Sequence, residues 1–216
     1  MKKYLLFDLD GTLTDPMKGI TNSVAYALEY YGIHVEDRTS LCSFIGPPLK
    51  DSFMEYYGFE EKKAQEAVWK YREYFSEKGI FENEVYQGIP QLLEQLTGNG
   101  RTLIVATSKP TVYARQILEH FELDRFFTDV QGSNLDGTRV NKDEVIAHAL
   151  RENRVSDREE AVMIGDRKHD ILGGKKCGLD TIGVLFGYGS LREMQDCKAD
   201  RIAKSVEELG RMLLLI

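Results

Sequence analysis

The stretch YLLFDLDGT, residues 4–12, joins an apolar, strand-forming run to two carboxylates and a glycine. Residues two apart in a strand point to the same side, so Asp8 and Asp10 begin on one side while Leu9 turns away into packing. Gly11 then allows the backbone to turn sharply and to approach a ligand closely. Open α/β sheets bind ligands at the carboxyl ends of their strands, so the stretch predicts a chemical site. The pattern Asp-x-Asp-Gly alone is also typical of a simple turn.

Strand and helix patterns alternate in the second part of the chain. Apolar runs typical of short buried strands lie at 102–107, 127–131, 161–166, 181–185 and 199–205, and helical patterns lie between them at 110–120, 141–153 and 171–177. Ser205 and Glu208 have the spacing of a capping box for a final helix. This alternation predicts an α/β fold, a Rossmann-like parallel sheet with helices on both faces.

The segment between the first strand and residue 82 shows no strand pattern. Its helical patterns at 18–31, 48–57 and 60–78 are each followed by a glycine, namely Gly32, Gly58 and Gly79. An all-helical block therefore interrupts the α/β pattern. We expect two domains, a core formed by residues 1–15 and 83–216 and an inserted helical domain formed by residues 16–82.

Composition excludes several classes of protein. A net charge of −7 over 216 residues provides no basic face for a nucleic-acid polymer. Three cysteines without disulfide or zinc spacing favour a reducing, cytoplasmic setting. The N-terminus has no signal-peptide pattern, and the apolar run at 212–216 is too short to span a bilayer, so no membrane partner is expected. The sequence predicts no particular oligomeric state.

Two further stretches carry polar groups where a strand ends or a helix begins. Thr107, Ser108 and Lys109 follow an apolar strand and precede Pro110, which suits a first helical turn. A hydroxyl and exposed amides there can hold a phosphate oxygen, although an ordinary helix cap has the same pattern. Lys142 stands at a predicted helix start, where a positive charge is mildly unfavourable and where most lysines are solvated surface residues.

The stretch GDRKHD, residues 165–170, follows another apolar strand. Asp166 and Asp170 are four apart and share a helix face. Facing Asp8 and Asp10, they form a site of hard oxygen donors that suits Mg²⁺, although the pattern alone can be a helix cap with an exposed acid. We expect His169 within the stretch to be exposed and not a ligand.

FDLDGTLTD (7–15), Thr107, Lys142 and GDRKHD resemble, in order, the four motifs of the haloacid dehalogenase superfamily. The resemblance implies that Asp8 attacks phosphorus to form an aspartyl-phosphate, and that Asp10 protonates the leaving oxygen and then deprotonates water. It places Mg²⁺ on the carboxylates of Asp8 and Asp166 and the backbone carbonyl of Asp10, with Asp170 supporting the metal waters or Lys142.

The same resemblance implies the phosphate contacts. Thr107 and the amides of Leu9 and Asp10 would hold phosphate oxygens, and Lys142 would offset the charge of nucleophile and phosphate. Here Lys142 is followed by Asp143, where many relatives have proline. The helical block resembles a cap that closes over the site and excludes water. Further candidate substrate contacts are Ser108, Lys109, Arg167 and, in the cap, Asn22, Gly46 and Lys50.

The stretches DGTLTDPMKGITNSVAYAL, FIGPPLKDSF and ATSKP are similar to the 5′-nucleotidase-like branch, close to the phosphoglycolate phosphatases. We therefore expect hydrolysis of a small phosphorylated metabolite, with 5′-nucleotides favoured. Phe44, Phe53 and Tyr57 offer a surface for a base, although helical packing explains them equally. The alternatives are a phosphoglycolate phosphatase, a sugar phosphate phosphatase or phosphomutase, and, remotely, a non-catalytic phosphate-binding scaffold. The dehalogenase branch lacks an acid at the position of Asp10.

Overall fold

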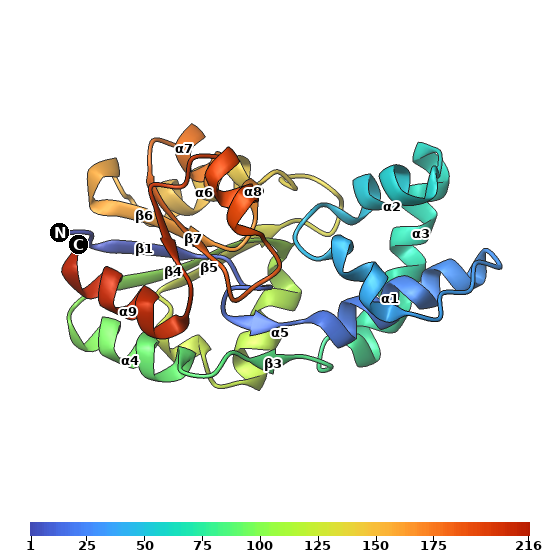
Figure 1. Ribbon diagram of the computed structural model, residues 1–216, viewed down its shortest axis with the longest axis horizontal. Coiled ribbons are helices and arrows are strands. Elements are labelled where there is room, and N and C mark those ends of the chain that lie inside the picture. Colours follow the sequence, from blue (N-terminus) through green and yellow to red (C-terminus); the bar gives the residue numbers. More distant parts are fainter. The chain divides into compact units, whose positions relative to one another are not determined.

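The computed structural model describes residues 1–216, and the chain forms two compact units (Figure 1). One unit contains Met1–Asp15 and Val85–Ile216, and the other contains Pro16–Glu84. The chain passes between them at two short strands that pair with each other, β2 (Thr14–Asp15) and β3 (Glu84–Val85). The first unit therefore consists of two segments of the chain, whereas the second is continuous.

A six-stranded sheet forms the centre of the first unit. Its strand order is β5-β4-β1-β6-β7-β8, and neighbouring strands are parallel. The strands are β1 (Tyr4–Phe7), β4 (Thr102–Pro110), β5 (Asp129–Ser133), β6 (Ala161–Gly165), β7 (Asp180–Val184) and β8 (Arg201–Ala203). The predicted α/β class is confirmed. β4 extends beyond its apolar run to Pro110, and its pairing with β5 shifts register between Ala106 and Pro110.

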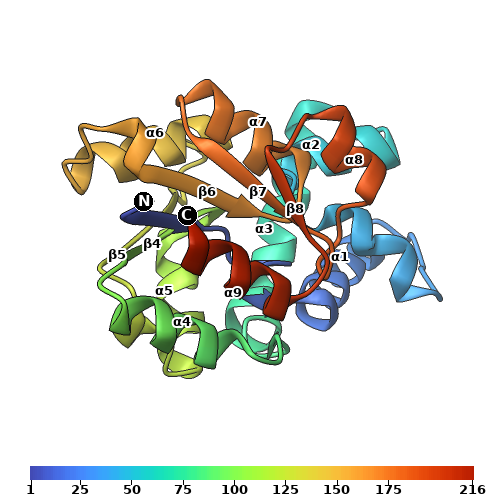
Figure 2. The ribbon, with the colours of Figure 1, turned by 60° about the vertical axis from the view of Figure 1, so that its left-hand side comes forward.

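Helices cover both faces of this sheet, as Figures 1 and 2 show, with α6 and α7 on one face and α4, α5 and α9 on the other. Their bounds are α4 (Ile89–Gly98), α5 (Thr111–His120), α6 (Lys142–Glu152), α7 (Lys168–Lys176), α8 (Leu191–Asp196) and α9 (Val206–Leu215). α8 is a short helix that the sequence patterns did not predict. At α9 the Ser205 side chain accepts a hydrogen bond from the Glu208 amide, as expected for an N-cap.

The core of this unit fixes the strand ends. Leu5, Leu6 and Phe7 of β1 are fully buried. On one face, α6 packs Val145 and Ile146 onto the sheet within a buried cluster that includes Leu6. Because β1 has a neighbouring strand on each side and helices above and below, the residues that follow Phe7 start from a rigid position.

The second unit is built from helices. These are α1 (Met17–Tyr30), α2 (Leu49–Tyr57) and α3 (Glu61–Tyr74), with a 3₁₀ segment at Arg38–Phe44 and a π-helical turn at Phe75–Gly79 that follows α3. Phe44 and Phe53 are buried with ring centroids 5.0 Å apart, so packing inside this unit accounts for both. No helix of the chain is both long enough and apolar enough to cross a membrane.

Candidate active site

Neighbouring strands bring the polar residues of three sequence stretches to one sheet edge in the first unit. Asp8 directly follows β1, and Asp166 directly follows β6. The two strands pair with Phe7 opposite Ile164, and the Asp8 amide donates to the Ile164 carbonyl at 2.9 Å. On the other side Phe7 pairs with Val105 of β4, two residues before Thr107. Strand register therefore sets the spacing between these side chains.

Three carboxylates form a compact cluster at this edge. Asp8, Asp166 and Asp170 each offer an oxygen, and these oxygens lie within 4.8 Å of one another. The residues are 4%, 0% and 1% exposed. Their donors are oxygens without a histidine or cysteine in the group, which is the set that hard cations such as Mg²⁺ prefer. The residues present therefore fit a magnesium ion.

Lys142 lies inside this cluster rather than on the surface. Its Nζ is 2.8 Å from an oxygen of Asp8 and 2.7 Å from an oxygen of Asp170. It also donates to the Ala106 carbonyl at 3.0 Å. Burial lowers the pKa of Lys142, but Asp170 and Asp8 outweigh burial and raise it above the usual value, so the ammonium stays charged. Lys142 is the first residue of α6, and a capping box formed by Asn141 and Glu144 fixes that helix start.

Asp10 occupies a separate position beside a second buried lysine. Its carboxylate lies 2.9 Å from the Nζ of Lys109, and the side chain is not part of the three-carboxylate cluster. The other oxygen, Oδ1, is buried without a hydrogen-bond partner. Burial raises the pKa of Asp10 despite the opposing effect of Lys109. A carboxyl group of this kind retains its proton more readily than a solvated aspartate.

The buried charges of the site do not balance. Four carboxylates, of Asp8, Asp10, Asp166 and Asp170, accompany two ammonium groups, of Lys109 and Lys142. Burial raises the pKa of Asp166, and it raises the pKa of Asp170 to about 6. The excess of acids is an independent reason to expect a bound dication, because buried like charges are costly unless they are neutralised.

Two glycines make room for the carboxylates. Gly11 has φ +81°, and a Cβ built on it would lie 2.3 Å from an oxygen of Asp166. A Cβ on Gly165 would lie 2.2 Å from the Cγ of Asp170. The close neighbour of Gly11 is thus Asp166, one of the three clustered acids, and its approach to a ligand stays a prediction. Any larger residue at either position would displace a carboxylate of the cluster.

The structure places the other predicted phosphate contacts near this edge. Thr107 is buried, and its hydroxyl accepts a hydrogen bond from the Lys109 amide at 3.3 Å. The Ser108 carbonyl accepts from Ser133 at 2.8 Å. Leu9 is fully buried in packing, as the alternation of β1 requires. The roles of these residues in holding phosphate stay predictions.

The remaining substrate candidates have partners within their own units. Arg167 lies 3.1 Å from Glu193 through its Nε. In the second unit Asn22 donates to Glu82 at 3.0 Å, Lys50 pairs with Glu61 at 2.5 Å, and Gly46 has φ +103°. Their contact with substrate is likewise a prediction.

His169 is half-buried, and the expectation that it is exposed is wrong. It lies on the first turn of α7, next to the buried Asp170. Burial lowers the pKa of His169, and the positive charges of Lys168 and Arg167 lower it further. The imidazole is therefore neutral at physiological pH, and it is not part of the oxygen cluster.

Sequence reasoning missed the loop after β7, residues 186–189. The Tyr188 amide donates to an oxygen of Asp166 at 2.7 Å. A Cβ on Gly187 would lie 2.1 Å from the Gly11 carbonyl, so this loop contacts the turn after β1. The available signal was Gly-Tyr-Gly directly after an apolar strand, where glycines permit a close backbone approach.

Replacing Lys142 by methionine should destabilise the metal-free protein by about 3–5 kcal/mol at neutral pH, because two buried carboxylates lose their partner. The pKa of Asp170, already raised by burial, then rises further because Lys142 no longer lowers it, and the folded state binds more protons than the unfolded chain. Stability of the variant should therefore fall as pH rises, with a larger deficit at pH 8 than at pH 5. Urea unfolding in EDTA measures this effect.

The control variant Lys175→Met removes a partly exposed ion pair with Asp200 and should cost less than about 1 kcal/mol. Equal losses of stability for the two variants would contradict the role of Lys142 as the buried partner of the two carboxylates.

Comparison with known proteins identifies the family. The model of the haloacid dehalogenase-like hydrolases matches residues 5–184. A 5′-nucleotidase of Pseudomonas aeruginosa is 53% identical over 191 residues, which cover 88% of this chain and 86% of that protein. A crystal structure described as a predicted phosphatase from Clostridium acetobutylicum is 50% identical, with a TM-score of 0.98 over 100% of both chains. Tyrosine-protein kinase PtkA of Mycobacterium tuberculosis is 40% identical over 187 residues, 87% of this chain and 63% of that protein. The chain belongs to the haloacid dehalogenase-like hydrolases and is a phosphatase of that family.

Proposed function

We propose that this protein is a Mg²⁺-dependent phosphomonoester hydrolase that works through an aspartyl-phosphate. The observation that carries the proposal is the arrangement around Asp8. Its buried carboxylate lies 2.8 Å from Lys142 and belongs to a cluster with Asp166 and Asp170. A carboxylate in this setting can act as a nucleophile that a fixed cation holds in one orientation.

Asp8 performs the first chemical step. One carboxylate oxygen attacks phosphorus, an acyl-phosphate bond forms, and the phosphorus–oxygen bond to the leaving alcohol breaks. Two anions must meet for this to happen, and Lys142 reduces the repulsion because its ammonium is buried against Asp8. A dication held by Asp8 and Asp166 would neutralise further charge and orient the phosphoryl group. Thr107 and the amides of Leu9 and Asp10 are the proposed donors to the phosphate oxygens.

Asp10 supplies the proton transfers. Burial raises its pKa, so a larger fraction of this carboxyl group is protonated than in a solvated aspartate. The proton passes to the leaving oxygen as the first bond breaks. The resulting carboxylate then takes a proton from the water that attacks the aspartyl-phosphate, and this returns Asp8 to its free state. Lys109, 2.9 Å away, keeps the Asp10 side chain in place through both steps.

The helical unit is the proposed cap. We assign the core to residues 1–15 and 83–216 and the cap to residues 16–82; the division between the compact units falls close by, at Glu84 and Val85. The core residues supply only phosphoryl chemistry, so selection among substrates falls to the cap. Asn22, Gly46 and Lys50 are its proposed contacts.

Nucleoside 5′-monophosphates are the favoured substrates. The 5′-nucleotidase relative at 53% identity supports this choice. Phosphoglycolate, the runner-up, needs a cation for its carboxylate, and the two candidates already have acidic partners: Lys50 pairs with Glu61 and Arg167 with Glu193. Sugar phosphates remain a further alternative. We expect a cytoplasmic enzyme, in keeping with its three free cysteines.

Asp8→Asn should abolish steady-state turnover of p-nitrophenyl phosphate while the protein remains folded, because the amide is a poor nucleophile of similar shape. Circular dichroism and thermal unfolding check the fold, and mass spectrometry excludes deamidation back to aspartate. The control Asp157→Asn changes an exposed N-cap of a 3₁₀ turn and should leave turnover unchanged. Near-normal turnover by purified Asp8→Asn protein would refute the proposed nucleophile.

Removal of divalent metal should stop the reaction. The cluster of Asp8, Asp166 and Asp170 offers only oxygen donors, so EDTA should abolish activity and added Mg²⁺ should restore it. Activity is measured after passage over a chelating resin and then across a series of metals. Full turnover in metal-free buffer, or restoration by Zn²⁺ alone, would be incompatible with this proposal.

The substrate preference is decided by kcat/KM for the common 5′-mononucleotides and for phosphoglycolate under one Mg²⁺ condition. We expect at least one nucleotide to exceed phosphoglycolate. Glucose 6-phosphate and glucose 1-phosphate in the same series distinguish hydrolysis from mutase activity, because a mutase interconverts them without releasing phosphate. An advantage of tenfold or more for phosphoglycolate over every nucleotide would establish the runner-up instead.

A further inference from the structure

The loop of residues 186–189 links two parts of the first unit that are remote in sequence. From its backbone, the Tyr188 amide donates to Asp166 at 2.7 Å. From its side chain, the Tyr188 hydroxyl donates to Asp15. Asp15 is the last residue before the chain leaves this unit. One residue therefore contacts both a proposed metal ligand and the strand that leads out of the core.

Tyr86 and Asp15 are both neighbours of the Tyr188 side chain. The Tyr188 hydroxyl donates to the carboxylate of Asp15. Tyr86 also interacts with Tyr188. Burial raises the pKa of Tyr86, and Asp15, Asp166 and Asp10 raise it further, so the Tyr86 hydroxyl stays protonated.

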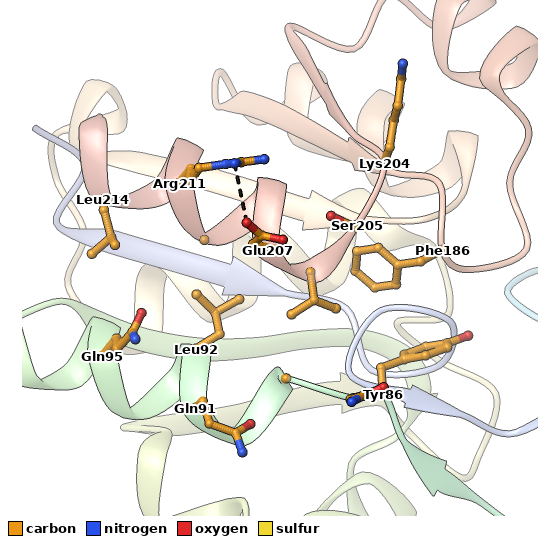
Figure 3. A pocket seen from close by; sticks show the side chains of 14 residues that line it. Tyr86, Gln91, Leu92, Gln95, Phe186, Lys204, Ser205, Glu207, Arg211 and Leu214 are labelled. Atoms are coloured by element: carbon orange, nitrogen blue, oxygen red, sulfur yellow. Dashed lines mark ion pairs between the residues drawn. The ribbon is translucent and has the colours of Figure 1, made fainter.

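Aromatic packing anchors the other end of the loop. The ring of Phe186 meets the ring of Tyr86 edge to face, with centroids 5.4 Å apart. Figure 3 shows the two rings side by side at one end of a groove, about 720 Å³ in volume, that α4 and α9 also line. The loop is thus held by Phe186 through packing and by Tyr188 through a hydroxyl, with Gly187 against the Gly11 carbonyl between them.

Asp166 depends on this loop for its orientation. It is fully buried, its side chain accepts from the Tyr188 amide at 2.7 Å, and its only other described side-chain donor is the longer contact from Thr12 at 3.4 Å. A Cβ on Gly189 would overlap the Asp166 carbonyl, so the loop also packs on its backbone. Outer groups that orient a ligand contribute substantially to metal affinity.

We propose that Tyr188 is a positioning residue for the metal site, whose hydroxyl bond to Asp15 holds the loop so that the Tyr188 amide orients Asp166. This rests on the proposed Mg²⁺-dependent function. The hydroxyl itself touches neither the cluster nor the substrate, and it acts through the loop backbone. Asp15, the last residue before the chain leaves the first unit, accepts the hydrogen bond that holds the loop.

The test uses Tyr188→Phe, which removes the hydroxyl and retains both the ring and the backbone amide. Calorimetric titration of the metal-free protein with Mg²⁺ alone should show a Kd about tenfold higher than in the parent protein. Turnover of p-nitrophenyl phosphate should shift to higher Mg²⁺ and recover at saturation, with KM for the ester unchanged. Tyr4→Phe, which removes a hydroxyl at the opposite end of β1, is the matched control and should bind Mg²⁺ as the parent does.

Asp15→Ala provides a second, independent variant. It should raise the Kd for Mg²⁺ by a similar factor, and the double variant with Tyr188→Phe should be little worse than either single one, because both remove the same hydrogen bond. A lower unfolding temperature with unchanged Mg²⁺ affinity in both single variants would overturn the proposal and leave the hydrolase function intact. Absence of Mg²⁺ binding and of turnover in the parent protein would refute both.

Discussion

The ion pairs of Lys142 with Asp8 and Asp170 are the interaction on which the site depends. Carboxylates this close repel one another, and burial increases the cost because water no longer screens them. A buried ammonium 2.8 Å and 2.7 Å from the two acids offsets that cost. Because the bond to the Ala106 carbonyl and the capped start of α6 fix Lys142, the cation is positioned by the fold and not by the acids alone.

Strand geometry and glycines then determine which atoms can meet. The parallel pairing of β1 with β4 and β6 brings Asp8, Thr107 and Asp166 to one edge. Glycine is required at positions 11, 165 and 187 because a side chain at any of them would overlap an acid or the backbone next to it. Glycine loses more conformational entropy on folding than other residues do, and the close approach that it permits offsets this loss. Asp166 and Asp170 at this edge therefore each need a glycine beside them.

The α/β pattern, the order of the apolar runs and the carboxylates at strand ends were readable from the sequence because each depends on local periodicity. The burial and the partners of residues that depend on tertiary contacts were harder to predict. His169 is half-buried although it stands among charged residues. Tyr188 had no motif to identify it, since its contacts to Asp166 and Asp15 join distant parts of the chain. Lys109, which pairs with Asp10, lies where the register of β4 against β5 shifts, and no sequence pattern indicates such a shift.

The central place of β1 in the sheet has a consequence for synthesis on the ribosome. β1 is made first, yet its two partners begin at Thr102 and Ala161. The nascent β1 must therefore remain unpaired while the helical segment Pro16–Glu84, which is continuous in sequence, already has all its residues. Long-range strand pairing of this kind is slow, and an exposed apolar strand can associate with other chains. The sheet around β1 is thus completed late in synthesis, and until then the apolar residues of β1 are exposed to association with other chains.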